Sequence, residues 1–189
     1  YEIANTLPSL IRPALSGSLN YKGFVEVTGL AGLGENRANF IGLSTSQGFQ
    51  YTSWFYMGAG IGIDVAMARN TPVESRDRYV NTMALLPVFT DFRFNIPVAK
   101  SSSFFIDAKF GAAWFLGNNY INLYNGTISH SAQFFLQPTL GVRVPVSANG
   151  RQAVNFGVTY RLLTSNNNYD WSNKTISLNN IGASISFEW

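Results

Sequence analysis

The residues of this chain that could support covalent catalysis are its single histidine and the serines beside it. His130 is flanked by Ser129 and Ser131, and a histidine paired with a serine and oriented by a carboxylate is the usual machinery of acyl transfer. Successive residues of an extended chain point to opposite sides, so the imidazole would face neither hydroxyl. No acid lies near these residues in the sequence. We therefore predict no catalytic residue and expect His130 to be an ordinary loop residue.

Metal ions, cofactors and nucleic acids also lack a recognisable site. The chain has no cysteine, one histidine and no clustered acidic loop, so no ligand set for a metal can be assembled. The 13 Lys and Arg against 10 Asp and Glu give a net charge of +3 without a basic stripe. We expect no metal, no cofactor and no nucleic-acid partner.

A larger group of chemistry-bearing residues consists of charged side chains that alternate with apolar ones. They share one parity with glycine and alanine, while phenylalanine, isoleucine and valine occupy the other parity. Acids and bases are equal in number. The residues are Lys22, Glu26, Asp64, Asp91, Arg93, Asp107, Lys109, Arg143, Arg161 and Glu188.

The segments that carry these charges are predicted to be strands. In residues 55–68, Ile61, Ile63 and Val65 alternate with glycines and Asp64, which is the period of a strand. A helix here would carry several glycines at about 1 kcal/mol each relative to alanine. Similar alternation marks residues 86–96, 104–116, 134–144, 154–162 and 181–189, and less regularly 18–31, where Phe24 interrupts it, and 37–47. The count is eight strands.

The connections between these strands alternate in length. Those at 46–48, 98–101 and 147–150 are short, whereas 69–78, 117–131 and 164–173 are longer and polar. The first connection on the long side, at 32–36, is brief. Short turns at one end and long loops at the other are typical of an up-and-down membrane barrel. We assign residues 17–189 to this barrel and residues 1–16, which contain Pro8 and Pro13, to an N-terminal periplasmic or luminal segment.

The distribution of charge decides between a membrane barrel and a soluble one. No apolar run is long enough for a spanning helix, and mean hydropathy is +0.04. The crowded interior of a small barrel needs small residues, so the parity shared by glycine, alanine and the charges should face inward. The apolar parity then faces outward, the reverse of a lipocalin-type barrel, and fits lipid. The predicted fold is all-β, an eight-stranded antiparallel up-and-down transmembrane β-barrel.

Three segments resemble a known family. Residues 181–189 alternate and end on Phe187 and Trp189, as in the C-terminal strand of bacterial outer-membrane barrels. Residues 86–93 and 138–143 resemble strands of the outer-membrane β-barrel domain of Bacteroidetes, within the small eight-stranded OmpA/OmpX type. The resemblance covers about residues 17–189. It implies the bacterial outer membrane, periplasmic termini, and a barrel-assembly machinery that reads Phe187 and Trp189.

The resemblance transfers no catalytic residue. Lipid A deacylases of this type place histidine and serine two apart on one strand face, an arrangement that His130 and its neighbours do not match. The loops are more informative, because aromatic residues among asparagines suit contact with proteins or glycans. We identify Tyr120, Tyr124, Tyr169 and Trp171 as candidates for extracellular contact.

The balance of inward charges favours a closed lumen. A selective pore usually carries an excess of one sign at its constriction, whereas balanced charges can pair and fill the interior. We expect a non-enzymatic protein that acts through extracellular loops on surface ligands, or as an accessory subunit beside other outer-membrane proteins. A narrow pore for small solutes is the alternative, and a lipid-modifying enzyme is a further one.

Overall fold

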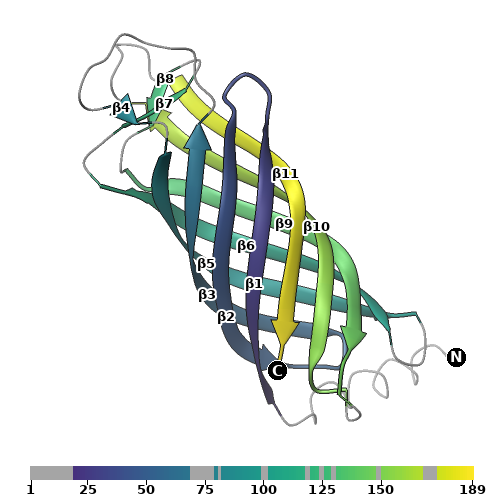
Figure 1. The fold of residues 1–189 in the computed structure, drawn as a ribbon. Coiled ribbons are helices and arrows are strands. Elements are labelled where there is room, and N and C mark those ends of the chain that lie inside the picture. Colours follow the sequence, from purple (N-terminus) through teal and green to yellow (C-terminus); the bar gives the residue numbers. More distant parts are fainter. Residues whose placement is uncertain are drawn as a thin grey trace, which may run out of the picture.

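Eight long antiparallel strands form a closed barrel (Figure 1). The structure, a computed structural model, describes residues 19–68, 79–80, 82–98, 102–117, 120–123, 126–128, 131–147, 150–167 and 174–189. The barrel strands are β1 (Asn20–Leu33), β2 (Ala38–Gln50), β3 (Phe55–Ala68), β5 (Thr82–Pro97), β6 (Ser103–Leu116), β9 (Gln133–Pro145), β10 (Ala153–Asn167) and β11 (Lys174–Glu188). In this part of the chain no helix is long and apolar enough to cross a membrane.

The barrel closes between its first and last strands. The order around the wall is β1-β11-β10-β9-β6-β5-β3-β2, and every neighbouring pair is antiparallel. Val25 lies opposite Phe187 where β1 meets β11, and Thr28 lies opposite Ser184. Closure leaves no strand edge with unpaired backbone groups, which is what a sheet in lipid requires. The predicted up-and-down antiparallel barrel is confirmed.

Alternation along the strands separates an apolar outside from a crowded inside. On β3, Ile61, Ile63 and Val65 are each close to half exposed, whereas Asp64 is 2% exposed. The same pattern holds on β10, where Val158 is exposed and Thr159 is buried. Strand geometry alone produces this division, because successive side chains leave the sheet on opposite faces.

Two turns at opposite ends of the barrel show how short connections close. Between β1 and β2, Gly34 takes a positive φ of 78°, and Arg37 Nε donates to its carbonyl at 2.6 Å. Between β9 and β10, Gly150 has a φ of 66° and donates its backbone N–H to the Ser147 carbonyl at 3.0 Å. Glycine is suited to both positions because it has no Cβ to clash in this region.

The predicted turn at residues 46–48 is wrong. β2 continues through these residues to Gln50, and the turn is at residues 51–54, where the Tyr51 N–H donates to the Phe55 carbonyl at 3.0 Å. Serine, glutamine and glycine suggested a turn by composition. Ser46 and Gly48 nevertheless continue the inward parity of the strand, with Ser46 2% exposed.

Several strands begin earlier or end later than their sequence pattern indicated. β11 starts at Lys174, where the predicted connection 164–173 ends, although alternation is visible only from residue 181; β10 runs to Asn167, and β5 starts at Thr82. The extra residues lie at the long-loop end, where the interior is apolar. Leu178 and Leu85 point inward there with no exposed surface, so a pattern that expected polar inward residues missed them.

This apolar interior forms a distinct layer at the long-loop end of the lumen, which we call the apolar layer. Its members share deep burial and come from strand ends on that side. Its large members are Leu30, Phe40, Met83, Leu85, Phe89, Phe115, Leu123, Phe135, Leu163, Ile176 and Leu178. The expectation that paired charges alone fill the lumen is therefore incomplete, because apolar packing closes one end of it.

A second, three-stranded sheet lies at the long-loop end (Figure 1). It consists of β4 (Tyr79–Val80), β7 (Tyr120–Leu123) and β8 (Gly126–Ile128), with β4 parallel to β7 and β7 antiparallel to β8. The sheet joins the connection after β3 to the connection after β6. Leu123 is buried and belongs to the apolar layer, so this loop sheet is anchored to the barrel interior.

Candidate functional site

The structure places all ten candidate luminal charges on the inner side of the barrel wall. Eight of them are at most 3% exposed, and Lys22 and Arg143 at the short-turn end are partly buried. They come from seven of the eight barrel strands, so closure of the barrel brings together residues far apart in the sequence. We call this set the luminal network.

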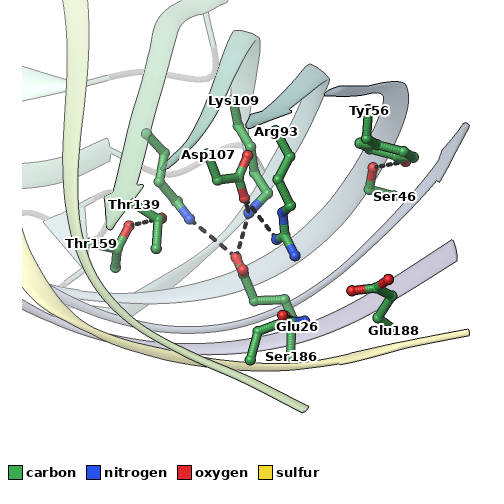
Figure 2. A network of polar contacts seen from close by, with 12 residues as sticks. Glu26, Ser46, Tyr56, Arg93, Asp107, Lys109, Thr139, Thr159, Ser186 and Glu188 are labelled. Carbon is green, nitrogen blue, oxygen red and sulfur yellow. Dashed lines mark hydrogen bonds and ion pairs between the residues drawn. The ribbon is translucent and has the colours of Figure 1, made fainter. Parts of the chain in front are cut away.

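The centre of the luminal network is built around Lys109 (Figure 2). Lys109 Nζ donates to Glu26 Oε1 at 2.8 Å and to Asp107 Oδ2 at 3.0 Å. Arg93 Nη2 donates to the same Asp107 oxygen at 3.0 Å. Gln137 adds a weaker bond from Nε2 to Glu26 Oε1 at 3.3 Å. Two cations therefore share one carboxylate, and each is held in a water-poor interior.

Two of the ion pairs cross the lumen. In the order of strands around the wall, β6 and β1 lie opposite one another, as do β10 and β3. Lys109 on β6 reaches Glu26 on β1, and Arg161 Nη1 on β10 reaches Asp64 Oδ2 on β3 at 2.6 Å. These pairs brace opposite walls, and a side chain that spans the diameter leaves little room for a continuous channel.

Aromatic rings complete the cages around the arginines. The Arg93 guanidinium carbon lies 4.1 Å from the Phe24 ring centroid and 4.5 Å from that of Phe105. Arg161 lies 5.4 Å from Phe40 and 5.3 Å from Phe135. Cation–π contact is strongest where water is excluded. Phe24, which seemed to break the alternation, is thus an inward residue that packs on a buried cation.

These inward aromatics are the functional residues that the sequence analysis missed. Their pairing with glycines on the neighbouring strand could have identified them. Gly60 is the cross-strand partner of Phe89, and Gly141 is the partner of Phe105. The pairing becomes visible only once the strand register is known.

Asp91 differs from the rest of the network. It has no exposed surface, and neither carboxylate oxygen has a hydrogen-bond partner among the described residues. Its cross-strand partner is Lys109, whose ammonium turns instead to Glu26 and Asp107. Buried polar groups are usually satisfied, so an unpartnered buried carboxyl marks a weak point of the network.

The short-turn end carries a smaller group of charges. Arg143 Nε donates to Glu188 Oε2 at 2.8 Å and Nη2 to Glu188 Oε1 at 3.0 Å, a two-pronged contact with one carboxylate. Lys22 pairs with the same Glu188. Arg143 also donates to the Gly150 carbonyl at 2.8 Å, which ties β9 to the turn that follows it.

The proposed assembly residues lie at the closure of the barrel. Trp189 exchanges two backbone hydrogen bonds of 3.1 Å with Gly23 on β1. Its ring stacks with that of Phe187 at 6.2 Å between centroids, and both side chains are exposed on the outer surface. A Cβ on Gly23 would clash with the Trp189 indole, so the glycine makes room for this ring.

The remaining candidates lie outside the described residues. Tyr124, Tyr169, Trp171 and His130 are among them, and for Tyr120 only the backbone in β7 is described. Within the described part of the chain, no group of three or more histidine, cysteine, aspartate or glutamate side chains could hold a metal ion.

No protein-family model matches this chain, and no curated protein matches its sequence. Among solved structures it is similar to Neisserial surface protein A (NspA), with 8% identity over 91% of this chain and 98% of that one, at a TM-score of 0.60. The chain has the fold of a small outer-membrane β-barrel. The outer membrane enzyme PagL is also similar, with 18% identity, coverage of 86% and 97%, and a TM-score of 0.49. A fold does not by itself fix a function, so the barrel does not decide whether this protein is an enzyme.

Proposed function

We propose that this protein is a non-enzymatic outer-membrane barrel with a closed lumen, which serves as a structural or interaction protein. The observation that carries the proposal is the filled interior. Ion pairs brace opposite walls at mid-height, and the apolar layer packs the long-loop end. A conducting channel needs a continuous polar path, and these two layers oppose one.

The outer surface supports placement in lipid. Large apolar side chains are exposed on every barrel strand, among them Ile41, Ile63, Val88, Phe134 and Ile185. Such a continuous apolar exterior would favour aggregation in water but matches the hydrocarbon of a membrane. Outer-membrane lipid is therefore the first partner that we propose.

The orientation and the interactions are also part of the proposal. The C-terminus lies at the short-turn end and the loop sheet at the opposite end (Figure 1), which supports a periplasmic C-terminus and extracellular loops. We propose that a ligand or another outer-membrane protein binds at this loop end. We further propose that the barrel-assembly machinery recognises Phe187 and Trp189 during biogenesis.

Conductance across a planar lipid bilayer tests the closed lumen. We expect the wild-type protein to be silent, because both interior layers block the path. Removing the cross-brace with Glu26→Gln loosens only one of the two layers and should produce at most brief leaks, because the apolar layer remains, whereas Val158→Ala on the lipid side should leave the protein silent. Steady wild-type conductance whose ion selectivity changes in Glu26→Gln would contradict the proposal and favour the narrow pore.

Crosslinking in native membranes tests the interaction role. Recovery of the same neighbouring protein in repeated experiments, and its loss when the loop sheet is disrupted, would support an accessory subunit. Recovery of nothing reproducible would count against that version.

For the enzyme alternative, we expect no lipid-modifying activity in the wild-type protein, and hence no change in His130→Ala.

A further inference from the structure

The short-turn mouth of the barrel contains a cavity of about 780 Å³, which we call the mouth cavity. This volume is in the range of small-molecule binding sites. Its described lining comes from the ends of β1, β2, β5, β6 and β9 and from the β2–β3 and β9–β10 turns. Deeper in the barrel, Arg93 and Asp107 are buried, so the mouth cavity leads into the filled luminal network rather than into an open path.

The charges around the mouth cavity favour an anion. Lys22 and Arg143 line it, and both pair with a single carboxylate, Glu188. Arg143 already holds both oxygens of Glu188, with distances of 2.8 and 3.0 Å. The Lys22 ammonium has three N–H donors, and Glu188 is its one described partner. Among the described residues that line the cavity or pair with its lining, two cations against one acid leave the mouth net positive.

An aromatic residue at the rim of the mouth cavity favours an apolar body. Trp54 lines the cavity, and its ring stacks at 6.0 Å, with an interplanar angle of 20°, on that of Phe94, an outward-facing residue of β5. Trp54 is 50% exposed although it is large and apolar. An aromatic or aliphatic group placed against this indole would bury surface that the free protein leaves exposed.

A third feature adds a requirement for a hydrogen-bond donor. Asn95 lines the same cavity, and its side-chain Oδ1 is buried without a hydrogen-bond partner. A buried acceptor without a partner is costly, so a ligand that donates an N–H to it gains more than it would from water.

We propose that the mouth cavity binds a small carboxylic acid that has an apolar or aromatic body and an N–H close to the carboxylate. The carboxylate pairs with Lys22, the body packs on Trp54, and the N–H donates to Asn95. Acylated amino acids and the C-terminal residue of a peptide share this chemistry. The inference goes beyond the closed, interacting barrel proposed above, which needs no ligand.

Titration of the protein in lipid nanodiscs with N-acetylphenylalanine tests the proposal, followed by the amide signals in nuclear magnetic resonance spectra. We expect saturable binding with shifts concentrated at Ser53, Asn95 and Gly150, all on the cavity lining. The neutral control, N-acetylphenylalanine amide, should bind about tenfold or more weakly, because it cannot make the charge-assisted bond.

Matched variants separate the cavity from the rest of the surface. Lys22→Met should weaken binding about tenfold, since Glu188 keeps its contacts with Arg143 and the barrel stays closed. Arg37→Met removes a cation from the opposite end and should leave affinity unchanged. Trp54→Ala should weaken binding as well. Because Trp54 lies in the β2–β3 turn, this variant could fail to fold, and in that case Lys22→Met alone tests the cavity.

A tetrapeptide with a C-terminal phenylalanine distinguishes the two kinds of ligand, acylated amino acids and peptide C-termini. Tighter binding of the peptide assigns the cavity to peptide C-termini, and tighter binding of the acylated amino acid assigns it to free small acids. The proposal is overturned if the amide binds as well as the acid or if shifts spread over the lipid-facing strands. It is also overturned if binding appears only after residues 1–18 are removed, because the chain would then occupy its own cavity.

Discussion

At the scale of single residues, the luminal network separates charges that stabilise the barrel from one that does not. Asp107 receives hydrogen bonds from both Arg93 and Lys109, each at 3.0 Å. Asp91 lies on the neighbouring strand β5, on the same inner face. Its carboxylate receives no hydrogen bond among the described residues. Burying a charge is costly unless partners compensate it, so the two aspartates should respond to substitution in opposite ways.

Neutral substitutions at the two aspartates test this difference. Asp107→Asn should lower the free energy of unfolding by roughly 3–5 kcal/mol, because it leaves two buried cations without their shared carboxylate. Asp91→Asn keeps the shape, removes a buried carboxylate that receives no hydrogen bond among the described residues, and should leave stability unchanged or higher. The midpoint of urea unfolding in lipid vesicles measures both. Equal losses in the two variants would show that Asp91 is as firmly paired as Asp107.

Substitution of the glycines that lie against inward aromatic rings should also lower the stability of the barrel. A Cβ at Gly60 would clash with the Phe89 ring, and one at Gly141 would clash with the Phe156 carbonyl oxygen and lie 2.6 Å from the Phe105 ring. We expect each alanine variant to lose about 1–3 kcal/mol of unfolding free energy through overpacking.

Gly29→Ala is the matched control for these glycine variants, because an added Cβ there has no atom within 4 Å. It should be neutral or slightly stabilising. Combining Gly60→Ala with Phe89→Leu should recover part of the loss, since the two residues are cross-strand partners and their effects should not add. Strict additivity would show that the clash with Phe89 is not the cause.

At the scale of elements, closure of the barrel depends on the last strand pairing with the first. Trp189 extends this pairing through its two backbone hydrogen bonds with Gly23, one position beyond the end of β11. The indole also covers the space that the missing Cβ of Gly23 leaves. Trp189 thus joins the seam through both its backbone and its ring.

Removal of Trp189 should therefore weaken the seam. We expect deletion of the residue to lower unfolding free energy by about 1–3 kcal/mol, from two net hydrogen bonds of roughly 0.5–1.5 kcal/mol each. The folded fraction, seen as the heat-modifiable band in gel electrophoresis, should fall in cells. Trp189→Phe keeps the backbone bonds and an aromatic ring and serves as the control. A deletion variant that folds and assembles like wild type would exclude this role.

The sequence predicted the barrel well and its interior less well. Alternation located the strands and the side on which Asp64, Asp107 and Arg161 lie, because strand geometry fixes parity locally. It could not show which charges pair, since Arg161 and Asp64 meet across the lumen from strands β10 and β3. The apolar layer also escaped prediction. Residues such as Leu178 point inward where the pattern for small membrane barrels expects polar side chains.

At the scale of the whole molecule, the two ends of the barrel have different chemistry. The long-loop end is closed by the apolar layer and covered by the loop sheet, whereas the short-turn end holds the mouth cavity with its excess of positive charge. A closed end toward the outside and an open, charged end toward the periplasm would suit a protein that seals the membrane while it presents sites to both compartments. This arrangement depends on the orientation of the barrel.

The absence of cysteine makes that orientation directly measurable. Arg37→Cys places a single thiol at the long-loop end, and Gln152→Cys places one at the short-turn end; both positions are exposed. A maleimide on a polymer too large to pass outer-membrane pores should label intact cells at position 37 only. Both variants should react after the cells are lysed, which controls for thiol access. Labelling of position 152 in intact cells would show that the barrel has the opposite orientation. The mouth cavity would then lie on the cell surface, and its ligand would have to be extracellular.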